Sequence, residues 1–374
     1  MFTLKTDCPT FTIHLDAPPE RRWTQVIEHY KEYIPEATNV ACDLLGKNTV
    51  KLLTPMLNLA FKTNQIIYKN ELLAIANQVS IEPGLLLLLQ LVYESFAACT
   101  SVIVRTKTHP IHIRTMDWDL PILRKLTFQG KFKIKNKTIF IGTSWAGYIG
   151  ILTGMRYKQN KKQESFSVSI NYRQTVECYK SPYAQYLRNI YRTITGCWPV
   201  SYLVREVLTH SHDYDTALKH FRSEELISPT YITICGEKTR NGAIITRNRS
   251  TSEPIYINKL YLSSTLVQAN MDHFDDNKYE KPKKPEKDFD LDIMDSRYRY
   301  SYVNLALNSS LPPDINKLYK IMCMPPCYSR ELNIYTCAMI PAEKFYKTMV
   351  KRNPKIYKQA KAELAKTVRY AKRF

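Results

Sequence analysis

The sequence predicts a layered α+β fold, and three observations lead to that prediction. Residues 1–98 place apolar side chains at spacings of three and four, which is typical of helices with one buried face. From Cys99 onward apolar residues alternate with a period near two, which is typical of strands. The later chain passes from strands to helices and back to strands. This order favours stacked layers of sheet and helix over a solenoid or a helix bundle.

The first 98 residues begin with one expected strand and continue as helices. Residues 10–17 alternate like a strand, and a helical pattern starts near Trp23, after Pro18 and Pro19. Further helices are expected over residues 36–62, 69–79 and 83–97. The most apolar run, residues 84–93, is well short of the roughly 20 residues that a membrane-spanning helix needs. It therefore predicts a buried helix.

Residues 99–350 are expected to form the body of the protein. Strands are expected over 99–105, 111–116, 125–134, 138–144, 165–170, 230–235, 242–248, 254–258 and 263–270. Helices are expected over 182–195, 199–209 and 213–222. A Lys- and Pro-rich insertion, residues 278–287, predicts an exposed loop.

The last segment, residues 351–374, is a basic tail. Residues 355–374 carry seven Lys and Arg against one Glu, and their apolar residues fall near one helical face. Such a helix can lie on anionic lipid, or it can be a solvated terminal helix.

Charge is unevenly spread along the 374 residues, which carry 54 Lys and Arg against 34 Asp and Glu, a formal net charge of +20. Residues 1–98 have 8 basic side chains against 10 acidic ones, whereas residues 343–374 have 11 against 2. The overall excess of basic side chains suggests an anionic partner. Because the sequence shows no motif of a nucleic-acid reader, nucleic acid is not expected.

The nine cysteines do not indicate a metal site, because none form a Cys-x-x-Cys pair and none lie near histidines at zinc spacing. Cys323 and Cys327 could close a small loop in an oxidising compartment, or remain two thiols. Residues 1–20 show no apolar run typical of a signal peptide. Three Asn-x-Ser/Thr sequons would suit a secretory route; they begin at Asn136, Asn248 and Asn308.

Motifs along nearly the whole chain resemble the acid ceramidase and N-acylethanolamine acid amidase family. Members carry Cys-Thr-Ser at a strand start and an Arg-Asn-(Met/Leu)-Asp motif; here these are Cys99-Thr100-Ser101 and Arg114-Thr115-Met116-Asp117. Further matches lie at residues 15–23, 93–94, 123–127, 147–154, 199–201, 245–249 and 334–336. The compact segment 119–126 is more similar to the acid amidase branch than to the ceramidases. Thr115 departs from the family's Asn, and the 278–287 insertion is foreign to both branches.

The resemblance implies an N-terminal nucleophile hydrolase with a four-layer αββα sandwich, made as one precursor and cut between Ala98 and Cys99. Residues 1–98 would become an alpha subunit and the rest a beta subunit, which together form a heterodimer. Cys99 would be the nucleophile, and the α-amine freed by cleavage, with an ordinary pKa of about 7.7–8.0, would be its base. Without the motifs, a lone cysteine is more often a small buried hydrophobe. No metal or organic cofactor is implied.

The resemblance also assigns roles to four further residues. Arg114 would favour the thiolate and Asp117 would hold the α-amine, since a turn after the strand could bring both toward Cys99; a local ion pair is the alternative. Asn270 would donate to the oxyanion, or else cap a turn. Arg297 matches the Arg of the family's Asp-Asp-Arg once the insertion is removed.

Aromatic and apolar residues suggest how a lipid substrate would bind. Trp118, Trp145, Tyr148 and Ile149 could wall a channel for an acyl chain, although core packing explains them equally well. Family members bind lipid surfaces through apolar helices, and Leu85–Leu89 lies in the comparable region. The expected reaction is hydrolysis of fatty acid amides, N-acylethanolamines first and ceramide second, at a membrane or lipid surface.

Two alternative functions remain at this point: an inactive family member that binds lipid, and an amidase of soluble acyl amides that resembles choloylglycine hydrolase. The combination of Cys99, Arg114, Asp117 and Asn270 favours an enzyme, because a binding protein has no chemical need for all four. The resemblance implies a lysosomal location. A cytoplasmic location is the alternative, since no signal peptide is visible.

Overall fold

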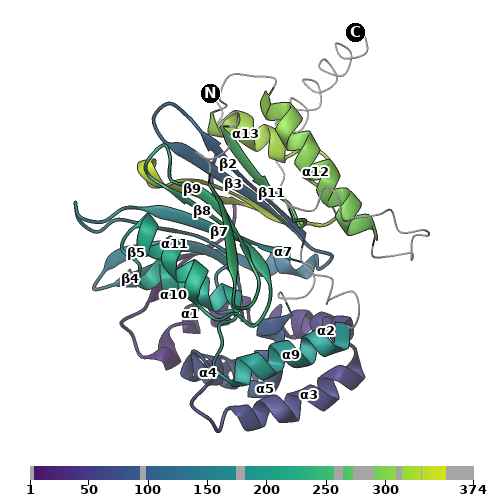
Figure 1. Cartoon of the computed structure of the whole chain (residues 1–374). Coiled ribbons are helices and arrows are strands. Elements are labelled where there is room, and N and C mark those ends of the chain that lie inside the picture. The colour runs from purple at the N-terminus through teal and green to yellow at the C-terminus, as the bar shows by residue number, and fades with distance from the viewer. Residues whose placement is uncertain are drawn as a thin grey trace.

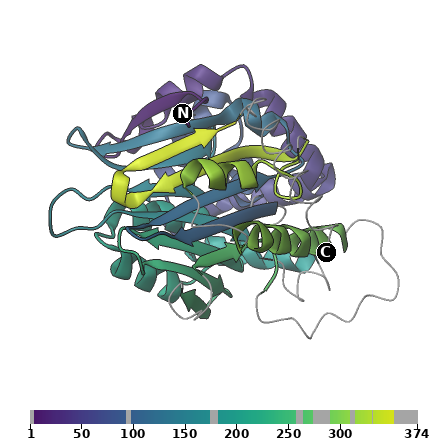
Figure 2. The same ribbon diagram turned by 90° about the horizontal axis from the view of Figure 1, so that it is seen from above.

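The protein folds into two stacked sheets with helices on both outer sides (Figures 1 and 2). This computed structural model describes residues 4–92, 98–173, 182–256, 264–272, 290–308, 314–329 and 331–350. The expected four-layer αββα arrangement is confirmed. The insertion at 278–287 and the tail at 351–374 lie outside the described residues.

The larger sheet has eight strands in the order β1-β4-β5-β6-β7-β8-β9-β10. They are β1 (Thr10–His14), β4 (Thr127–Ile134), β5 (Lys137–Trp145), β6 (Thr153–Arg156), β7 (Phe166–Tyr172), β8 (Thr230–Gly236), β9 (Gly242–Arg247) and β10 (Ser252–Tyr256). Strand β1 runs parallel to β4, and the other neighbours are antiparallel.

The smaller sheet has five antiparallel strands in the order β11-β2-β3-β12-β13. They are β2 (Ala98–Arg105), β3 (Pro110–Asp117), β11 (Thr265–Gln268), β12 (Asn333–Ile340) and β13 (Phe345–Met349). Strands β2 and β3 face β7 and β8 of the larger sheet. The central strands of the two sheets therefore form the middle of the sandwich.

Helices form the outer layers and an attached lobe, at the bottom of Figure 1. The larger sheet is covered by α10 (Val200–His210) and α11 (Tyr214–Ser223), and the smaller sheet by α12 (Asp290–Asn308) and α13 (Ile315–Met322). The lobe consists of the helices η1 (Pro19–Arg21), α1 (Thr24–Tyr30), α2 (Ile34–Leu45), α3 (Lys47–Ala60), α4 (Lys69–Val79), α5 (Pro83–Leu91) and α9 (Pro182–Ile194). Two short helices, α7 (Ile122–Leu126) and η2 (Pro341–Glu343), lie beside strands.

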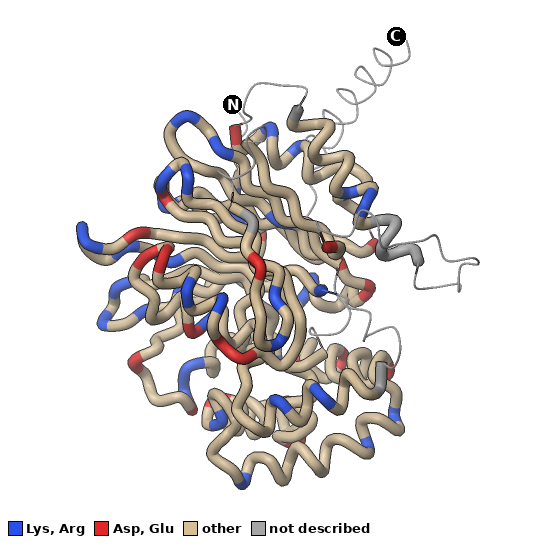
Figure 3. The backbone as a smooth tube through the Cα atoms, viewed as in Figure 1, with Lys and Arg blue, Asp and Glu red and all other residues tan. Residues whose placement is uncertain are grey.

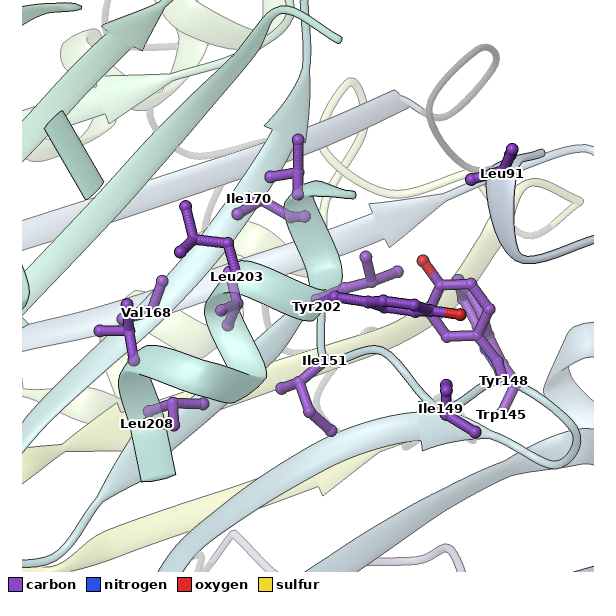
Figure 4. Close-up of a cluster of buried hydrophobic side chains, with 14 of the residues drawn as sticks. Leu91, Trp145, Tyr148, Ile149, Ile151, Val168, Ile170, Tyr202, Leu203 and Leu208 are labelled. Carbon is purple, nitrogen blue, oxygen red and sulfur yellow. The ribbon is translucent and has the colours of Figure 1, made fainter. Parts of the chain in front are cut away.

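The main core lies between the larger sheet and its helices. Figure 4 shows Tyr202 and Leu203 of α10 over Ile151, Val168 and Ile170, all of them buried. A second core, which contains Val102, Ile113 and Leu318, lies between the smaller sheet and the helices α12 and α13. Each sheet therefore has one face against its helices, and the remaining faces meet each other.

The first 98 residues are built into this body rather than forming a separate unit. Strand β1 is an edge strand of the larger sheet, and the Asp7 amide donates to the Thr348 carbonyl of β13 at 3.2 Å. In the lobe, Arg205 of α10 makes a two-pronged ion pair with Glu71 of α4, with both N–O distances 2.8 Å. Both side chains are buried, and Trp23 and Arg22 also donate to Glu71. A buried pair of this kind is costly to break from one side, so it fixes the lobe to the body.

Most elements expected from the sequence are present, although the bounds of three of them differ. The single helix expected over 36–62 is two helices, because Gly46 has a φ of 82° and ends α2. Residues 125–126 belong to α7, and the strand begins at Thr127. Helix α5 ends at Leu91, and residues 93–97 lie outside the described residues. The elements β6, α12, α13, β12 and β13 were not expected.

Within the described ranges, no single helix is long and apolar enough to cross a membrane. Helices α4 and α5 taken together have the length and composition of a membrane span, but their axes are bent by 113° relative to each other. Leu86, Leu87 and Leu88 of α5 are buried, which confirms the expectation of a buried helix.

Candidate active site

Cys99 is the second residue of β2, and the pairing of β2 with β3 determines its neighbours. In this antiparallel pair Cys99 lies opposite Met116, and Ser101 lies opposite Arg114. Because side chains alternate along a strand, Cys99, Ser101, Met116, Arg114 and His112 all point to the same face. That face is turned toward β7 of the larger sheet, and Cys99 is fully buried.

Arg114 lies diagonally across the strand pair from Cys99 and contacts its thiol. One guanidinium nitrogen is 3.1 Å from Cys99 Sγ and 2.8 Å from the Ile170 carbonyl oxygen. The other donates to the Tyr335 hydroxyl at 2.8 Å. Burial, the largest cause, raises the pKa of Tyr335 to about 12, so its hydroxyl stays neutral beside the arginine. A buried guanidinium at this distance stabilises negative charge on the sulfur.

The backbone of Cys99 is held by two side chains from outside the strand pair. Its nitrogen donates to Asn270 Oδ1 at 2.8 Å, and its carbonyl oxygen accepts from Arg299 at 2.5 Å. Arg299 also donates to Asn270 Oδ1 at 3.0 Å, and Asn270 Nδ2 donates to the Tyr172 carbonyl at 2.8 Å. Asn270 thus contacts Cys99 through its side-chain oxygen, which faces the nitrogen that would become the α-amine, while its amide group binds Tyr172.

On α12 the structure brings Arg299, rather than the expected Arg297, to Cys99. Arg297 is exposed, whereas Arg299 is buried and reaches Cys99, Thr100 and Asn270. Two residues along a helix are about 200° apart around its axis, so Arg297 and Arg299 point in nearly opposite directions. Arg299 was missed because the long insertion obscured the register of this helix.

Asp117 lies at the end of β3 itself, so the expected turn after Arg114 does not exist. The two residues are three apart in one strand, and their side chains leave opposite faces of the sheet. Asp117 accepts from Asn333 Nδ2 at 2.9 Å and from Thr115 Oγ1 at 3.4 Å. Asp117 also lies opposite Ala98, the residue before the nucleophile.

A chain of hydrogen bonds runs from the Cys99 carbonyl into the space between the sheets. Asn171 Nδ2 donates to the carbonyls of Cys99, Gln268 and Ala269, at 3.2, 2.9 and 3.1 Å. Its Oδ1 must then accept, and Ser101 donates to it at 2.7 Å. Because Ser101 donates its one hydroxyl hydrogen to Asn171, the Ser169 hydroxyl must donate to the Ser101 oxygen, at 2.8 Å.

His112 ends this chain. Its Nε2 is 2.9 Å from Ser169 and its Nδ1 is 2.9 Å from Ser167. Because the Ser169 hydrogen points to Ser101, Nε2 must carry a hydrogen and donate to Ser169. Burial, the largest cause, and the charge of Arg114 lower the pKa of His112 to about 3. The ring is therefore neutral, and Nδ1 accepts from Ser167.

An ion pair supports the loop that carries Asn270. Arg173 donates to both oxygens of Asp272 at 2.7 Å, and the Tyr231 hydroxyl donates to the same carboxylate at 2.6 Å. Arg173 and Asp272 each lie close in sequence to residues that hold the site. The Asn171–Arg173 segment, which had no expected role, therefore positions Cys99 and Asn270 through contacts of its own.

A cavity of about 100 Å³ lies beside this site, between the helical lobe and the body. Its lining includes Trp118, Trp145 and Tyr148, three of the residues expected to contact substrate, while Ile149 is buried outside it. Helices α2, α4 and α5 supply the opposite wall, with residues such as Ile34, Ile75 and Leu89. Trp118 follows Asp117 directly, and the Trp145 ring lies 6.5 Å from the Tyr335 ring. The cavity thus adjoins the end of β3 and the Tyr335–Arg114 pair.

Cysteines and possible metal ligands add nothing further to the site. Cys323 and Cys327 are buried, and Cys327 Sγ is 3.9 Å from the Arg299 carbonyl. Across the described ranges, no group of three or more His, Cys, Asp or Glu could hold a metal ion.

The fold and the site together define a class of protein. Two sheets stacked between helices, with a cysteine at the start of a central strand, are the architecture of the N-terminal nucleophile hydrolases. A solved structure of a Caenorhabditis elegans N-acylethanolamine-hydrolyzing acid amidase ortholog superposes with a TM-score of 0.55 at 23% identity. The match covers 68% of this chain and 100% of that one. At this identity the match bears on the fold alone.

Sequence comparisons show which proteins of that class the chain resembles. Residues 6–63 match the family model of the beta subunit of N-acylethanolamine-hydrolyzing acid amidase. The chain is 26% identical to the mouse N-acylethanolamine-hydrolyzing acid amidase, over 92% of this chain and 89% of the mouse protein. It is 28% identical to an acid ceramidase from Heterocephalus glaber, over 68% and 67%. It is also 29% identical to the uncharacterized protein R632 of Acanthamoeba polyphaga mimivirus, over 87% and 95%. Over most of its length the chain is therefore similar to named members of the acid ceramidase and N-acylethanolamine acid amidase family, which are amide hydrolases.

The protonation of His112 can be tested directly. We expect its imidazole to stay neutral, with the hydrogen on Nε2, from pH 7.5 down to about pH 3.5, because burial disfavours the charged form. Nitrogen-15 NMR of histidine-labelled protein distinguishes both tautomers and the cation. Since the unfolded chain binds this proton near pH 6.5 and the folded chain does not, the stability contribution falls as the pH drops below 6.5. A His112 resonance that titrates near pH 6.5 would contradict the chain of donors.

Proposed function

We propose that the protein is a cysteine amidohydrolase that is activated by cleavage before Cys99 and hydrolyses fatty acid amides, either N-acylethanolamines or ceramide. One observation carries the proposal: the Cys99 thiol lies 3.1 Å from Arg114 while the nitrogen of the same residue lies 2.8 Å from Asn270. Nucleophile and prospective base thus sit on one residue, each beside a group that stabilises it.

Activation would begin with attack of Cys99 Sγ on the Ala98 carbonyl carbon. The Ala98–Cys99 amide bond breaks, a thioester forms between Ala98 and Sγ, and the thiol proton passes to the freed nitrogen. Water then hydrolyses the thioester, which leaves the Ala98 carboxylate, the free thiol and the α-amine of Cys99. Asp117, opposite Ala98 in the sheet, and Asn270 both lie at this junction.

Hydrolysis of an amide would follow with the same groups. The α-amine takes the thiol proton, and the sulfur attacks the substrate carbonyl to form a tetrahedral oxyanion. The protonated α-amine then donates its proton to the leaving amine, and a thioester remains on Sγ. Water releases the fatty acid and restores the thiol. Arg114 would stabilise charge on the sulfur, and Asn270 and Arg299, which both contact the backbone of Cys99, would supply donors to the developing oxyanion.

The two chains made by cleavage would remain together as a heterodimer. The pairing of β1 with β4, the Glu71–Arg205 ion pair and Gln90 would all link them. Gln90 of α5 donates to the Gly147 carbonyl at 2.9 Å and accepts from the Ile149 amide at 3.0 Å. The cavity lies across this boundary, so the acyl chain of a substrate would touch both fragments. Two of the relatives are named as an acid amidase and an acid ceramidase. Their names support activity of this protein at acidic pH, which a lysosomal location would require.

A membrane-facing surface is proposed on α3 and α9 rather than on Leu85–Leu89, which is largely buried. Leu52, Met56 and Leu59 of α3 are 66%, 52% and 62% exposed and share one helical face. Leu187 and Tyr191 of α9 are also exposed. Neither helix contains Asp or Glu, whereas both carry Lys or Arg (Figure 3). Exposed apolar side chains with basic neighbours suit a surface of anionic lipid.

Replacing the nucleophile tests the proposed activation. We expect Cys99→Ala to remain one uncut chain without amidase activity, because neither acyl shift can occur without the thiol. Intact mass after incubation at pH 4.5 and 7.5, with N-terminal sequencing of fragments, measures this. Cys42→Ala, which alters a half-exposed thiol in the lobe, should be cut normally. Normal cleavage in Cys99→Ala would refute the mechanism, and an uncut, inactive wild type would favour the inactive lipid-binding alternative.

A pair of arginine variants tests the assignment on α12. We expect Arg299→Ala to lower the rate of amide hydrolysis by about 100-fold or more, because a charged donor near the reacting carbonyl is lost. Arg299→Lys should recover part of the rate, and Arg297→Ala should change it by less than about threefold. Thermal unfolding of all three shows whether the fold is kept. A larger loss in Arg297→Ala than in Arg299→Ala would return the role to Arg297.

Vesicle binding tests the proposed surface. The triple variant Leu52→Ser, Met56→Ser and Leu59→Ser should bind vesicles of phosphatidylcholine and phosphatidylserine at least about tenfold more weakly, because apolar burial is lost. Leu305→Ser, which alters an exposed leucine of α12 beside the other sheet, is the control. Hydrolysis of micellar substrate should fall with binding, and that of a soluble acyl amide should not. Equal binding by both variants would remove the proposal, and preference for soluble substrates would favour the choloylglycine-hydrolase-like alternative.

A further inference from the structure

Tyr335 of β12 touches Arg114 in two ways. Its hydroxyl oxygen lies 2.8 Å from one terminal nitrogen of the guanidinium, and the centroid of its ring lies 5.3 Å from the guanidinium carbon. Both side chains are fully buried. The motif matches include residues 334–336 but assign Tyr335 no role of its own. The geometry therefore raises the question of what this tyrosine does for the arginine beside the nucleophile.

The direction of the hydrogen bonds at Tyr335 follows from the chemistry of the groups. A guanidinium has donors only, so the Tyr335 oxygen must accept from Arg114. The hydrogen of the same hydroxyl is then available for Thr153 Oγ1, which lies 2.9 Å away on β6 of the larger sheet. The hydroxyl is thus held between Arg114 of one sheet and Thr153 of the other.

Tyr335 holds a different nitrogen of the guanidinium from the one that faces the sulfur. Cys99 Sγ and the Ile170 carbonyl oxygen both lie beside one terminal nitrogen, at 3.1 and 2.8 Å, so these two contacts alone let the planar group pivot about that nitrogen. Because the guanidinium is a rigid plane, holding its second terminal nitrogen stops the pivot. The Tyr335 contact therefore sets the direction in which Arg114 presents its hydrogen to the sulfur.

The hydroxyl holds Arg114 without cancelling its charge. Burial, the largest cause, raises the pKa of Tyr335 to about 12, so the phenol stays protonated at neutral and acidic pH. A carboxylate in the same place would pair with the guanidinium and compete with a thiolate for its charge. A neutral acceptor leaves the positive charge of Arg114 to the sulfur of Cys99.

We propose that Tyr335 is a positioning residue, whose hydroxyl fixes the guanidinium of Arg114 in the orientation that stabilises the thiolate of Cys99. The inference rests on the proposed function, because the orientation matters to catalysis only if Cys99 is the nucleophile. Without the hydroxyl the guanidinium stays near the sulfur but pivots, so part of its stabilising effect is lost. A neighbouring opposite charge shifts a pKa by about one to three units, and we expect this partial loss to raise the thiol pKa by about one unit.

The test measures the ionisation of the Cys99 thiol directly. Carbon-13 NMR of cysteine-labelled protein follows each thiol with pH, and the resonance that is missing from Cys99→Ala identifies Cys99. We expect Tyr335→Phe, which keeps the ring, to raise the thiol pKa by about one unit and to lower kcat at acidic pH about tenfold, with KM changed less than about twofold. Tyr346→Phe is the matched control. It removes another buried phenol hydroxyl between the same sheets, which binds Thr143 and the Thr153 carbonyl and should leave the Cys99 pKa unchanged.

An arginine variant separates positioning from a direct effect of the tyrosine. In an Arg114→Met background, Tyr335→Phe should change neither the thiol pKa nor the rate further, because Tyr335 acts only through the guanidinium. An equal effect in both backgrounds, an unchanged pKa in Tyr335→Phe, or the same shift in Tyr346→Phe would overturn the inference.

Two further results keep the test decisive. If Tyr335→Phe does not fold, Thr153→Val takes its place, because it removes the acceptor of the hydroxyl hydrogen; an unchanged Cys99 pKa in that variant would also overturn the inference. If wild type hydrolyses no amide, the proposed function fails by itself, whereas the NMR titration still decides whether Tyr335 positions Arg114.

Discussion

The arrangement of the site depends on one buried contact, the approach of the Arg114 guanidinium to the Cys99 sulfur at 3.1 Å. A cation with no exposed surface is expensive unless its hydrogen-bonding groups are matched. Here the sulfur, the Ile170 carbonyl and the Tyr335 hydroxyl accept from its two terminal nitrogens, and these acceptors come from β2, β7 and β12. The contact therefore requires both sheets to be in register. A slip of one residue between β2 and β3 would turn Arg114 to the opposite face of its sheet.

The polar chain behind Cys99 extends this requirement into the core. Asn171, Ser101, Ser169 and His112 are buried, and each uses its donor and acceptor in one consistent direction. Fully satisfied networks of this kind specify a single arrangement more strictly than apolar packing does. The carbonyl of Cys99 is fixed by the chain on one side and by Arg299 on the other. The strand start, where a new N-terminus would form, is thereby held from both sheets and from α12.

Much of this could be read from the sequence, and the failures have identifiable physical causes. The switch of period at Cys99 predicted β2, because alternation follows directly from strand geometry. Gly46 was missed because the apolar spacing continues on both sides of it, and only its φ of 82° ends α2. Arg299 was missed because Arg297 and Arg299 are the same type of residue. They differ only in the direction in which their side chains leave the helix, which the sequence did not show. Asn171 and His112 were not singled out, because the contacts that connect them to Cys99 join strands far apart in sequence.

The lobe raises a different physical question, namely how two fragments would stay together after the chain between them is cut. Burial alone would raise the pKa of Glu71, but the ion pair with Arg205, together with Trp23 and Arg22, outweighs burial and lowers it. A carboxylate whose pKa is lowered in the fold contributes stability above its unfolded pKa and loses it only as the pH falls through the folded value. The Glu71–Arg205 pair therefore persists at mildly acidic pH. The pKa of His112 is also lowered by folding, so its contribution changes in the same direction but at higher pH: it already falls as the pH drops below about 6.5, the pKa of the unfolded chain. Acid conditions thus weaken the polar core of the site before they weaken the attachment of the lobe that completes its cavity.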